Sequence, residues 1–268
     1  MINHTELVNI CSAFIAPKSI ITSEQLLDGL SNDNFLVRTE QQAYLLKCYK
    51  QHWPEVGLEA QRVLSNQNVC PAPIWLDKAN KHAAFNYIEG GSAHSGLTQN
   101  LVSKLAKMHG YSITTQPMKI AQELLFYKQS RIYQQYQPAI KHALDTVTKM
   151  PFNAGFCHND LVTENIIENA TGMYLIDFEY AKTNDVYFDL AALAVSFKLN
   201  KKSDKILLAD YQKCQQGRGD FVQSINKLNC YKLLYLVLCI GWYEQRAIKT
   251  ESLQLNAQLY QLTTFIDL

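Results

Sequence analysis

Residues 156–180 read FCHNDLVTENIIENATGMYLIDFEY, and the polar residues of this stretch decide the fold. His158, Asp160 and Asn165 form the pattern His-x-Asp-x-x-x-x-Asn, and Asp177 ends the apolar run MYLI twelve residues after Asn165. Taken singly, Asp160 could cap a turn, Asn165 could be a loop residue and Asp177 could be a strand-end carboxylate. The combination at this spacing is much rarer than any of its parts and indicates a catalytic constellation.

Two apolar segments of this stretch, residues 166–167 and 173–176, flank the turn ENATG. Apolar segments on either side of a glycine-containing turn predict a β-hairpin, which would bring Asn165 and Asp177 to the same end of a small ribbon. Phosphoryl transfer needs a carboxylate that orients and deprotonates a hydroxyl group, together with oxygen ligands for Mg²⁺. We therefore predict that Asp160 is the catalytic base and that Asn165 and Asp177 are magnesium ligands.

The segments HNDLVTENII and LIDFEYA resemble the catalytic loop and the metal-binding segment of the aminoglycoside phosphotransferase and choline kinase superfamily. The resemblance implies an α+β, bilobal protein-kinase-like fold, with an N-terminal antiparallel β lobe that carries one helix and a larger, mostly α C-terminal lobe. It also implies ATP and Mg²⁺ as cofactors. Asp189, in YFDLA, matches a family aspartate that holds the catalytic loop, although it could equally be a helix N-cap; we expect Asp189 and His158 to be structural.

Residues 1–89 are expected to form the nucleotide-binding lobe, because apolar and β-branched clusters alternate there with turn residues. Paired strands are predicted at 34–38 and 43–49, a helix at 55–66, and further strands at 74–75 and 83–88.

Lys47 lies in the strand LLKCY and Glu59 in the helix that follows, so a buried pair of the two would let the lysine reach the phosphates of ATP. Lys47 could instead be an edge-strand lysine, and Glu59 could lie on a solvated helix face. The turn at 28–34 has one glycine and resembles the Gly-x-x-Asn turn of choline and thiamine kinases. There, backbone groups and Ser31 or Asn32 would hold the phosphates.

Residues 85–90 occupy the expected hinge, where the backbone at Tyr87 and Ile88 would hydrogen-bond the adenine, although Tyr87 could simply pack between lobes. The Gly pair at 90–91 marks the lobe boundary, so residues 90–268 form the expected catalytic and substrate-binding lobe. Helical periodicity is present at 98–109, 118–148, 189–199, 204–215 and 221–262, around a non-helical island at 156–188.

Aromatic and acidic residues follow the predicted metal ligand and recur near the end of the chain. Such residues can hold a cation by cation–π contact and ion pairing, and the candidates are Glu179, Tyr180, Trp242 and Glu244. The aromatic residues around Trp242 could equally be a core stripe, because they recur at helical spacing.

The resemblance leaves more than one substrate open. HNDL and IDFEY are similar to choline and ethanolamine kinases, whereas the chain length and GWYEQR are similar to bacterial thiamine kinase. Both resemblances imply phosphorylation of the hydroxyl of a cationic alcohol. The alternatives are an aminoglycoside- or homoserine-type kinase and a catalytically weak kinase-fold ligand-binding module. A protein kinase is disfavoured, because the chain contains neither D-F-G nor A-P-E.

The composition argues against large charged partners. The chain has 25 basic and 24 acidic residues, a net charge of +1 and no long like-charge block, so we expect no nucleic-acid or membrane partner. Seven scattered cysteines predict free thiols in a reducing cytoplasm. A small, cationic substrate is expected, and both a monomer and a homodimer remain open.

Overall fold

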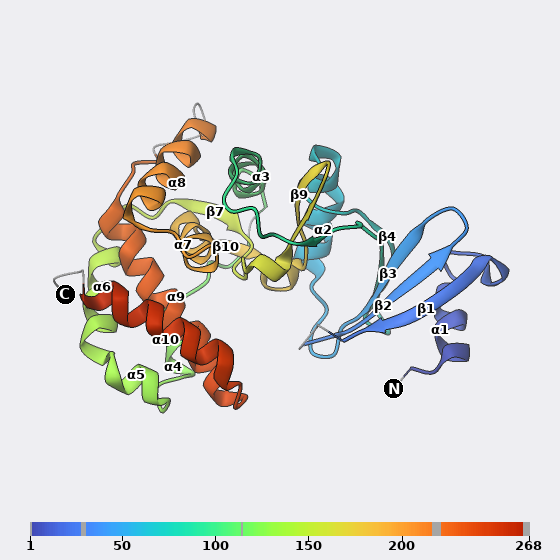
Figure 1. The fold of residues 1–268 in the computed structure, drawn as a ribbon, viewed down its shortest axis with the longest axis horizontal. Helices are drawn as coiled ribbons and strands as arrows, with labels where there is room; N and C mark the ends of the chain where they lie inside the picture. The colour runs from blue at the N-terminus through green and yellow to red at the C-terminus, as the bar shows by residue number, and fades with distance from the viewer. Residues whose placement is uncertain (1, 28–30, 114, 216–220, 265–268) are drawn as a thin grey trace. The chain divides into compact units, whose positions relative to one another are not determined.

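The computed structural model describes residues 2–27, 31–113, 115–215 and 221–264 (Figure 1). The chain divides into two compact units. Unit 1 is Met1–Gly91 together with Ile167–Glu179, and unit 2 is Ser92–Ile166 together with Tyr180–Leu268. The residues around Asp177 therefore group with the N-terminal part of the chain, although they follow the HNDL segment in the sequence.

Unit 1 contains a five-stranded antiparallel sheet in the order β1-β2-β3-β5-β4. Its strands are β1 (Ile20–Leu26), β2 (Asp33–Thr39), β3 (Ala43–Cys48), β4 (Pro73–Asp77) and β5 (His82–Asn86). The predicted pairing of residues 34–38 with 43–49 is confirmed, and its register places Asn34 opposite Lys47. The sequence did not predict β1, because this edge strand buries none of its residues and so lacks an apolar face.

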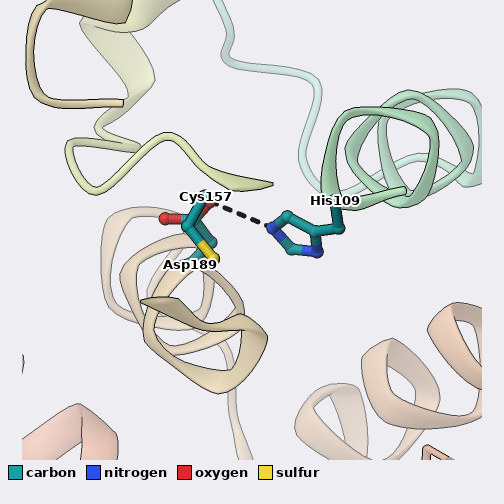
Figure 2. Close-up of side chains that lie close together, drawn as sticks. All are labelled: His109, Cys157 and Asp189. Carbon is teal, nitrogen blue, oxygen red and sulfur yellow. Dashed lines mark hydrogen bonds and ion pairs between the residues drawn. The ribbon is translucent and has the colours of Figure 1, made fainter. Parts of the chain in front are cut away.

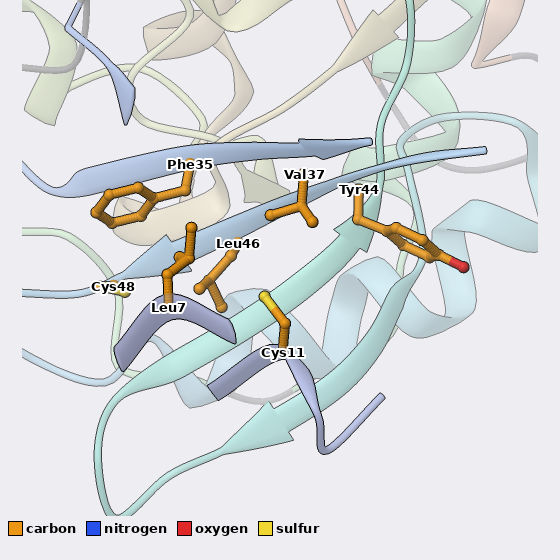
Figure 3. Packing of buried hydrophobic residues seen from close by; sticks show 7 residues of the cluster. All are labelled: Leu7, Cys11, Phe35, Val37, Tyr44, Leu46 and Cys48. Carbon is orange, nitrogen blue, oxygen red and sulfur yellow. The ribbon is translucent and has the colours of Figure 1, made fainter. Parts of the chain in front are cut away.

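One face of this sheet packs against α1 (His4–Cys11) (Figure 3). The sequence analysis predicted a helix at 55–66 in this part of the chain and did not predict α1. The cluster on this face consists of Leu7, Cys11, Phe35, Val37, Tyr44, Leu46 and Cys48. Successive side chains of a strand point to opposite faces, so Lys47, between Leu46 and Cys48, points away from this cluster. The neighbours of Lys47 on its own face, Leu45 and Tyr49, pack with Leu58 of α2 (Glu55–Leu64).

The hairpin predicted from the apolar segments around ENATG is confirmed. β8 (Ile166–Asn169) and β9 (Gly172–Leu175) are neighbours in a three-stranded sheet in the order β6-β8-β9, in which β6 is Gly91–Ser92. The N–H of Leu175 donates to the carbonyl of Val69 at 2.9 Å, so β9 is fixed to the chain that follows α2. Asp177 lies two residues after the end of β9, so the position of its main chain is fixed by the same bond.

Gly57 of α2 lies against the segment that follows Asp177. A Cβ at Gly57 would lie 2.1 Å from the carbonyl oxygen of Phe178, which is closer than real atoms approach. A residue without a side chain is therefore required where α2 meets this segment.

Unit 2 is mainly helical. Its helices are α3 (Gln99–His109), α4 (Ile120–Leu125), α5 (Arg131–Gln135), α6 (Gln137–Thr148), α7 (Val186–Ser196), α8 (Lys201–Cys214), α9 (Ile225–Gln245) and α10 (Lys249–Thr264). Residues 186–195 of α7 are all buried, so α7 is the central helix of the unit, and it packs against α9. β7 (Ala154–Cys157) and β10 (Lys182–Asp185) form an antiparallel pair that contacts α7.

The two longest helices predicted from the sequence are broken in the structure. Residues 118–148 divide into α4, α5 and α6, since Ser130 caps a new helix and Pro138 fits the first turn of the next one. Residues 221–262 divide at Ala247, whose φ of 56° separates α9 from α10.

The start of α7 also differs from the prediction. Asp185, and not Asp189, is the N-cap, because its carboxylate accepts the N–H of Tyr187 at 3.1 Å. Asp189 lies one turn inside the helix, so its carboxylate is available for another partner.

No helix in the described ranges has both the length and the apolar character needed to cross a bilayer. All seven cysteines belong to the described residues, and no disulfide joins any two of them there.

A Gly57→Ala variant should be less stable, although alanine is the better helix former by about 1 kcal/mol. The added methyl group meets a backbone carbonyl, and overpacking of this kind costs about 1–3 kcal/mol. Urea unfolding followed by circular dichroism measures the change. Gly91→Ala is the matched control, because a Cβ at Gly91 would have no atom within 4 Å. An unchanged or raised free energy of unfolding for Gly57→Ala would contradict the close approach.

Candidate active site

The predicted base lies in unit 2, in the turn that follows β7. The amide Nδ2 of Asn165 donates to the carbonyl oxygen of Asp160 at 2.8 Å and to its carboxylate Oδ2 at 3.0 Å. The predicted base and one predicted metal ligand are therefore in direct contact. These bonds do not use Oδ1 of Asn165, which is the atom of this amide that can bind a cation.

Asn159 holds the turn that leads to Asp160, a role that the sequence analysis missed. Its φ is 64°, in the left-handed region that asparagine tolerates better than most residues. Its Nδ2 donates to the carbonyls of Tyr180 at 3.0 Å and Lys182 at 3.3 Å, and its Oδ1 accepts from Asn184 Nδ2 at 2.8 Å. The sequence signal for this role was an asparagine, a residue common in tight turns, directly before the predicted base.

Asp189, a buried residue of α7, binds the main chain just before Asp160. The N–H of His158 donates to its Oδ2 at 2.7 Å, and the N–H of Asn159 donates to its Oδ1 at 2.9 Å. His109 Nε2 lies 3.0 Å from the same Oδ2 (Figure 2). These contacts fix the turn of residues 158–160, which is called the catalytic turn below after the predicted base that it carries.

His109, Cys157 and Asp189 lie close enough together to be considered as a metal centre (Figure 2). Both ring nitrogens of His109 are already used, because Nδ1 is 2.6 Å from the hydroxyl of Tyr211 and Nε2 is bonded to Asp189. Burial raises the pKa of the Cys157 thiol well above its ordinary value, which disfavours the thiolate that a metal would need. We therefore interpret this cluster as a hydrogen-bonded network.

In unit 1, Asp177 forms an ion pair with Lys47 of β3. Nζ and Oδ1 are 2.5 Å apart, and the lysine side chain is 6% exposed while the aspartate side chain is 30% exposed. Asp177 has a φ of 64°, a strained backbone geometry that is frequent at functional sites. Burial raises the pKa of Tyr49, and the charges of Asp177 and Glu179 raise it further, so these two carboxylates act on one small region.

The sequence analysis was wrong to pair Lys47 with Glu59. Glu59 is exposed on α2, and the acidic partner of Lys47 is Asp177. The buried positions of α2 include Leu58 and Gln61, so the helical phase turns Glu59 toward solvent.

Asn32 and Glu179 contact each other in the interior of unit 1. Asn32 Nδ2 donates to Glu179 Oε2 at 2.7 Å, and Asn32 Oδ1 accepts the N–H of Lys50 at 3.2 Å. The two residues are 4% and 7% exposed. The amide of Asn32 thus fixes the segment after Asp177. Of the predicted phosphate turn, residues 28–30 lie outside the described residues, and Ser31 is half-buried.

Tyr87 and Ile88, the predicted adenine-binding hinge, follow β5 and are both half-buried. The N–H of Tyr87 donates to the carbonyl of Ala43 at 3.0 Å, and the guanidinium of Arg38 lies 5.9 Å from the Tyr87 ring. An adenine contact at Tyr87 would therefore use its carbonyl group.

One face of α9 approaches the catalytic turn of unit 2. Tyr235, Cys239 and Tyr243 follow one another at one-turn spacing, and the pKa of each is raised by burial and, to a smaller extent, by the charge of Asp160. The pKa of Tyr243 is raised to about 12, chiefly by burial, with contributions from the charges of Glu164 and Glu251. The charges of three carboxylates, those of Glu164, Glu251 and Asp160, thus act on the Tyr243 phenol, although less than burial does.

The predicted substrate residues Trp242 and Glu244 lie beside this face. The guanidinium carbon of Arg246 is 3.7 Å from the centre of the Trp242 ring, so one face of this indole already has a cation of the chain against it. Glu244 is half-buried, and Tyr180 is 40% exposed. Of the two aromatic residues at the end of α9, Tyr243 is the one whose pKa is raised by the charge of Asp160.

Comparison with known proteins gives the family of the chain. Residues 22–219 match the model of the phosphotransferase enzyme family, a span that contains the catalytic turn, Asp177 and Asp189. The chain belongs to the phosphotransferase enzyme family. Its relatives include a thiamine kinase.

The phosphotransferase is 27% identical over 212 residues to the protein LicA homolog of Metamycoplasma hominis. This alignment covers 72% of this chain and 79% of the relative. It is 25% identical over 237 residues to thiamine kinase of Escherichia coli K12, with 81% of this chain and 80% of the relative covered. The solved structure of choline kinase LicA from Streptococcus pneumoniae superposes with a TM-score of 0.74 at 21% identity and covers 98% of this chain and 100% of that one. The kinase-like fold predicted from the sequence is confirmed.

The bond from Asn32 to Glu179 predicts a charge-swap rescue in this phosphotransferase. Asn32→Asp places two buried carboxylates together and should lower the free energy of unfolding by about 1–3 kcal/mol at pH 7.5. Repulsion raises the pKa of such a pair in the folded state, so the lost stability should return as the pH falls and one carboxyl group takes up a proton. Urea unfolding at several pH values measures both effects.

The double variant Asn32→Asp with Glu179→Gln restores one donor and one acceptor in the opposite sense. Its stability at pH 7.5 should return close to that of the unmodified protein. An Asn32→Asp variant as stable as the unmodified protein, or a double variant no more stable than Asn32→Asp, would refute the bond.

Proposed function

We propose that this phosphotransferase uses ATP and Mg²⁺ to phosphorylate the hydroxyl group of a small cationic alcohol. The observation that carries the proposal is the bonding around Asp160. Its carboxylate is oriented by Asn165, and the main chain before it is held by Asp189. A base oriented from both sides is what the transfer requires, because the protein contributes mainly positioning to this reaction.

Asp160 acts as the base that accepts the hydroxyl proton. Asn165 Nδ2 donates to Oδ2 of this carboxylate and so fixes its plane. A base in this role must lie within hydrogen-bonding reach of the hydroxyl, and the fixed carboxylate reduces the conformational freedom that would be lost on binding.

Asn165 of unit 2 and Asp177 of unit 1 would each offer an oxygen ligand to Mg²⁺, and Lys47 would bind the phosphates of ATP. Amide and carboxylate oxygens are the hard ligands that Mg²⁺ prefers, and the part-exposed carboxylate of Asp177 can exchange its contact with Lys47 for a cation. When bound, Mg²⁺ neutralises charge on the phosphate oxygens. Lys47 is anchored in β3 with its stem buried, so its ammonium group is presented in one place.

A positive charge on the substrate is supported by the surroundings of Tyr243. The charges of Glu164, Glu251 and Asp160 all raise the pKa of this phenol, and an aromatic ring on which negative charges act suits a quaternary or aromatic cation. Choline and thiamine, named in two of the similar proteins, are both cations that carry a primary alcohol. Ethanolamine, homoserine and aminoglycosides remain the alternatives for the screen described next.

Release of ADP from the purified protein, screened with choline, ethanolamine, thiamine, homoserine and aminoglycosides, tests the proposal. We expect Mg²⁺-dependent turnover with a cationic alcohol, and Asp160→Asn should lower kcat by about 10²–10⁴-fold while nucleotide binding is retained. Asp145→Asn, at an exposed carboxylate of α6, is the matched control and should leave kcat unchanged. Full activity of Asp160→Asn would remove the base assignment, and turnover of none of the alcohols would favour a ligand-binding module.

Replacement of Tyr243 should weaken binding of the alcohol selectively. Tyr243→Leu removes a cation–π contact of about 0.5–2 kcal/mol and should raise the KM for the alcohol about 2- to 30-fold without changing the KM for ATP. Trp242→Leu is the comparison variant and should have the smaller effect, because Arg246 already covers its ring. Steady-state kinetics measure both KM values. A larger rise in the KM for the alcohol in Trp242→Leu than in Tyr243→Leu would contradict our placement of the substrate.

A further inference from the structure

A chain of hydrogen bonds within unit 2 leads from α8 to Asp189. Gln215 Nε2 is 2.7 Å from the hydroxyl of Tyr211, this hydroxyl is 2.6 Å from His109 Nδ1, and His109 Nε2 is 3.0 Å from Asp189 Oδ2. The side chains of His109 and Asp189 are 1% and 0% exposed. Hydrogen bonds in such dry surroundings are strong, and leaving one of their groups unsatisfied is costly.

In these hydrogen bonds each donor lies on the side of Gln215 and each acceptor on the side of Asp189. The Asp189 carboxylate can only accept, so a neutral His109 bonds to it as the Nε2–H tautomer, and Nδ1 of that tautomer accepts from the hydroxyl of Tyr211, which accepts in turn from Nε2 of Gln215. Burial raises the pKa of Tyr211 well above its ordinary value, so the hydroxyl keeps the proton that it donates. Every polar atom that links Gln215 to Asp189 is satisfied in this arrangement.

Close packing holds the imidazole of His109 in place. A Cβ at Gly155 of β7 would lie 3.2 Å from His109 Cβ and 2.6 Å from Val186 Cγ1, so the backbone of β7 passes close to His109 at its Cβ. On the other side, the Tyr211 ring meets the imidazole edge-to-face with centroids 5.5 Å apart, and it meets Phe221 in the same way at 4.8 Å.

We infer that His109 and Tyr211 are positioning residues for Asp160, acting through Asp189 on the main chain of His158 and Asn159. Asp189 Oδ2 accepts from both His109 and the N–H of His158, so loss of the imidazole frees the carboxylate to turn away from the catalytic turn. The inference rests on the proposed role of Asp160 as the base. It adds α3 and α8 to the elements on which that role depends.

Four variants of the whole chain test this inference. His109→Ala removes the donor to Asp189, and His109→Gln keeps an N–H within reach of the same oxygen. Tyr211→Phe removes only the hydroxyl and is the milder change should His109→Ala fold poorly. Tyr187→Phe is the matched control, because Tyr187 is also buried and stacks on Phe221 at 5.2 Å. The hydroxyl of Tyr187 donates to the carbonyl of Val222 and takes no part in the hydrogen bonds that link Gln215 to Asp189.

Two readouts separate this inference from the proposed function. The first is kcat, together with the KM for ATP. The second is the rate of amide hydrogen exchange at His158 and Asn159, followed by NMR without substrate. We expect His109→Ala to lower kcat by about 10²-fold with an unchanged KM for ATP, because a base displaced by about 1 Å loses that much. His109→Gln should recover most of the loss, and Tyr211→Phe should show a smaller one.

Exchange at both amides should be faster in His109→Ala and Tyr211→Phe, and unchanged in Tyr187→Phe. Unchanged exchange in the first two variants would overturn the inference. A kcat loss in Tyr187→Phe equal to that in His109→Ala would also overturn it, since the effect would then follow general stability. Should the unmodified protein phosphorylate no alcohol, the proposed function fails, and the exchange rates alone decide whether His109 and Tyr211 hold this turn.

Discussion

The carboxylate of Asp189 makes the interaction on which the rest of the catalytic turn depends. A buried charge is costly unless it is fully hydrogen-bonded, and Asp189 meets this condition with two main-chain N–H groups and the imidazole of His109. Hydrogen bonds to a charged group contribute about 1.5–3 kcal/mol each, so the main chain at His158 and Asn159 is held firmly. Asn159 can then keep its positive φ, and Asp160 follows from a fixed starting point.

Unit 1 also contains a buried charge, the ammonium group of Lys47, which is compensated by an ion pair with Asp177. The alternation of β3 turns Lys47 away from the α1 cluster, and its ammonium group would be buried without a partner if Asp177 did not lie beside it. The approach of α2 at Gly57 and the bond between Asn32 and Glu179 fix the chain just after Asp177. Several contacts that look structural when taken singly therefore serve to present Lys47 and Asp177 together.

The catalytic turn and the hairpin could be predicted because their signals are local. The spacing of Asp160 and Asn165 and the turn ENATG lie within one short segment, where sequence distance limits spatial distance. The partner of Lys47 could not be predicted in this way, since Asp177 is far along the chain and Glu59 was the nearer acid. The phase of α2, which is set by its packing, decided between the two.

Other features depended on tertiary contacts that no local pattern contains. Ala247 gives no sequence signal for the left-handed turn that ends α9, and the sequence analysis considered a helix cap at Asp189 but not at Asp185, which caps α7. His109 resembles an ordinary basic residue at the C-terminus of a helix, a position where such residues are common. Only the fold shows that its imidazole reaches Asp189.

The central claim is that this phosphotransferase moves a phosphoryl group from ATP to the hydroxyl of a cationic alcohol. Phosphorus-31 NMR of the purified protein with ATP, Mg²⁺ and either choline or thiamine tests it most directly. Our account predicts a phosphate monoester resonance that grows in step with ADP for at least one of these alcohols. ADP accompanied only by inorganic phosphate, or unchanged ATP with both alcohols, would contradict it.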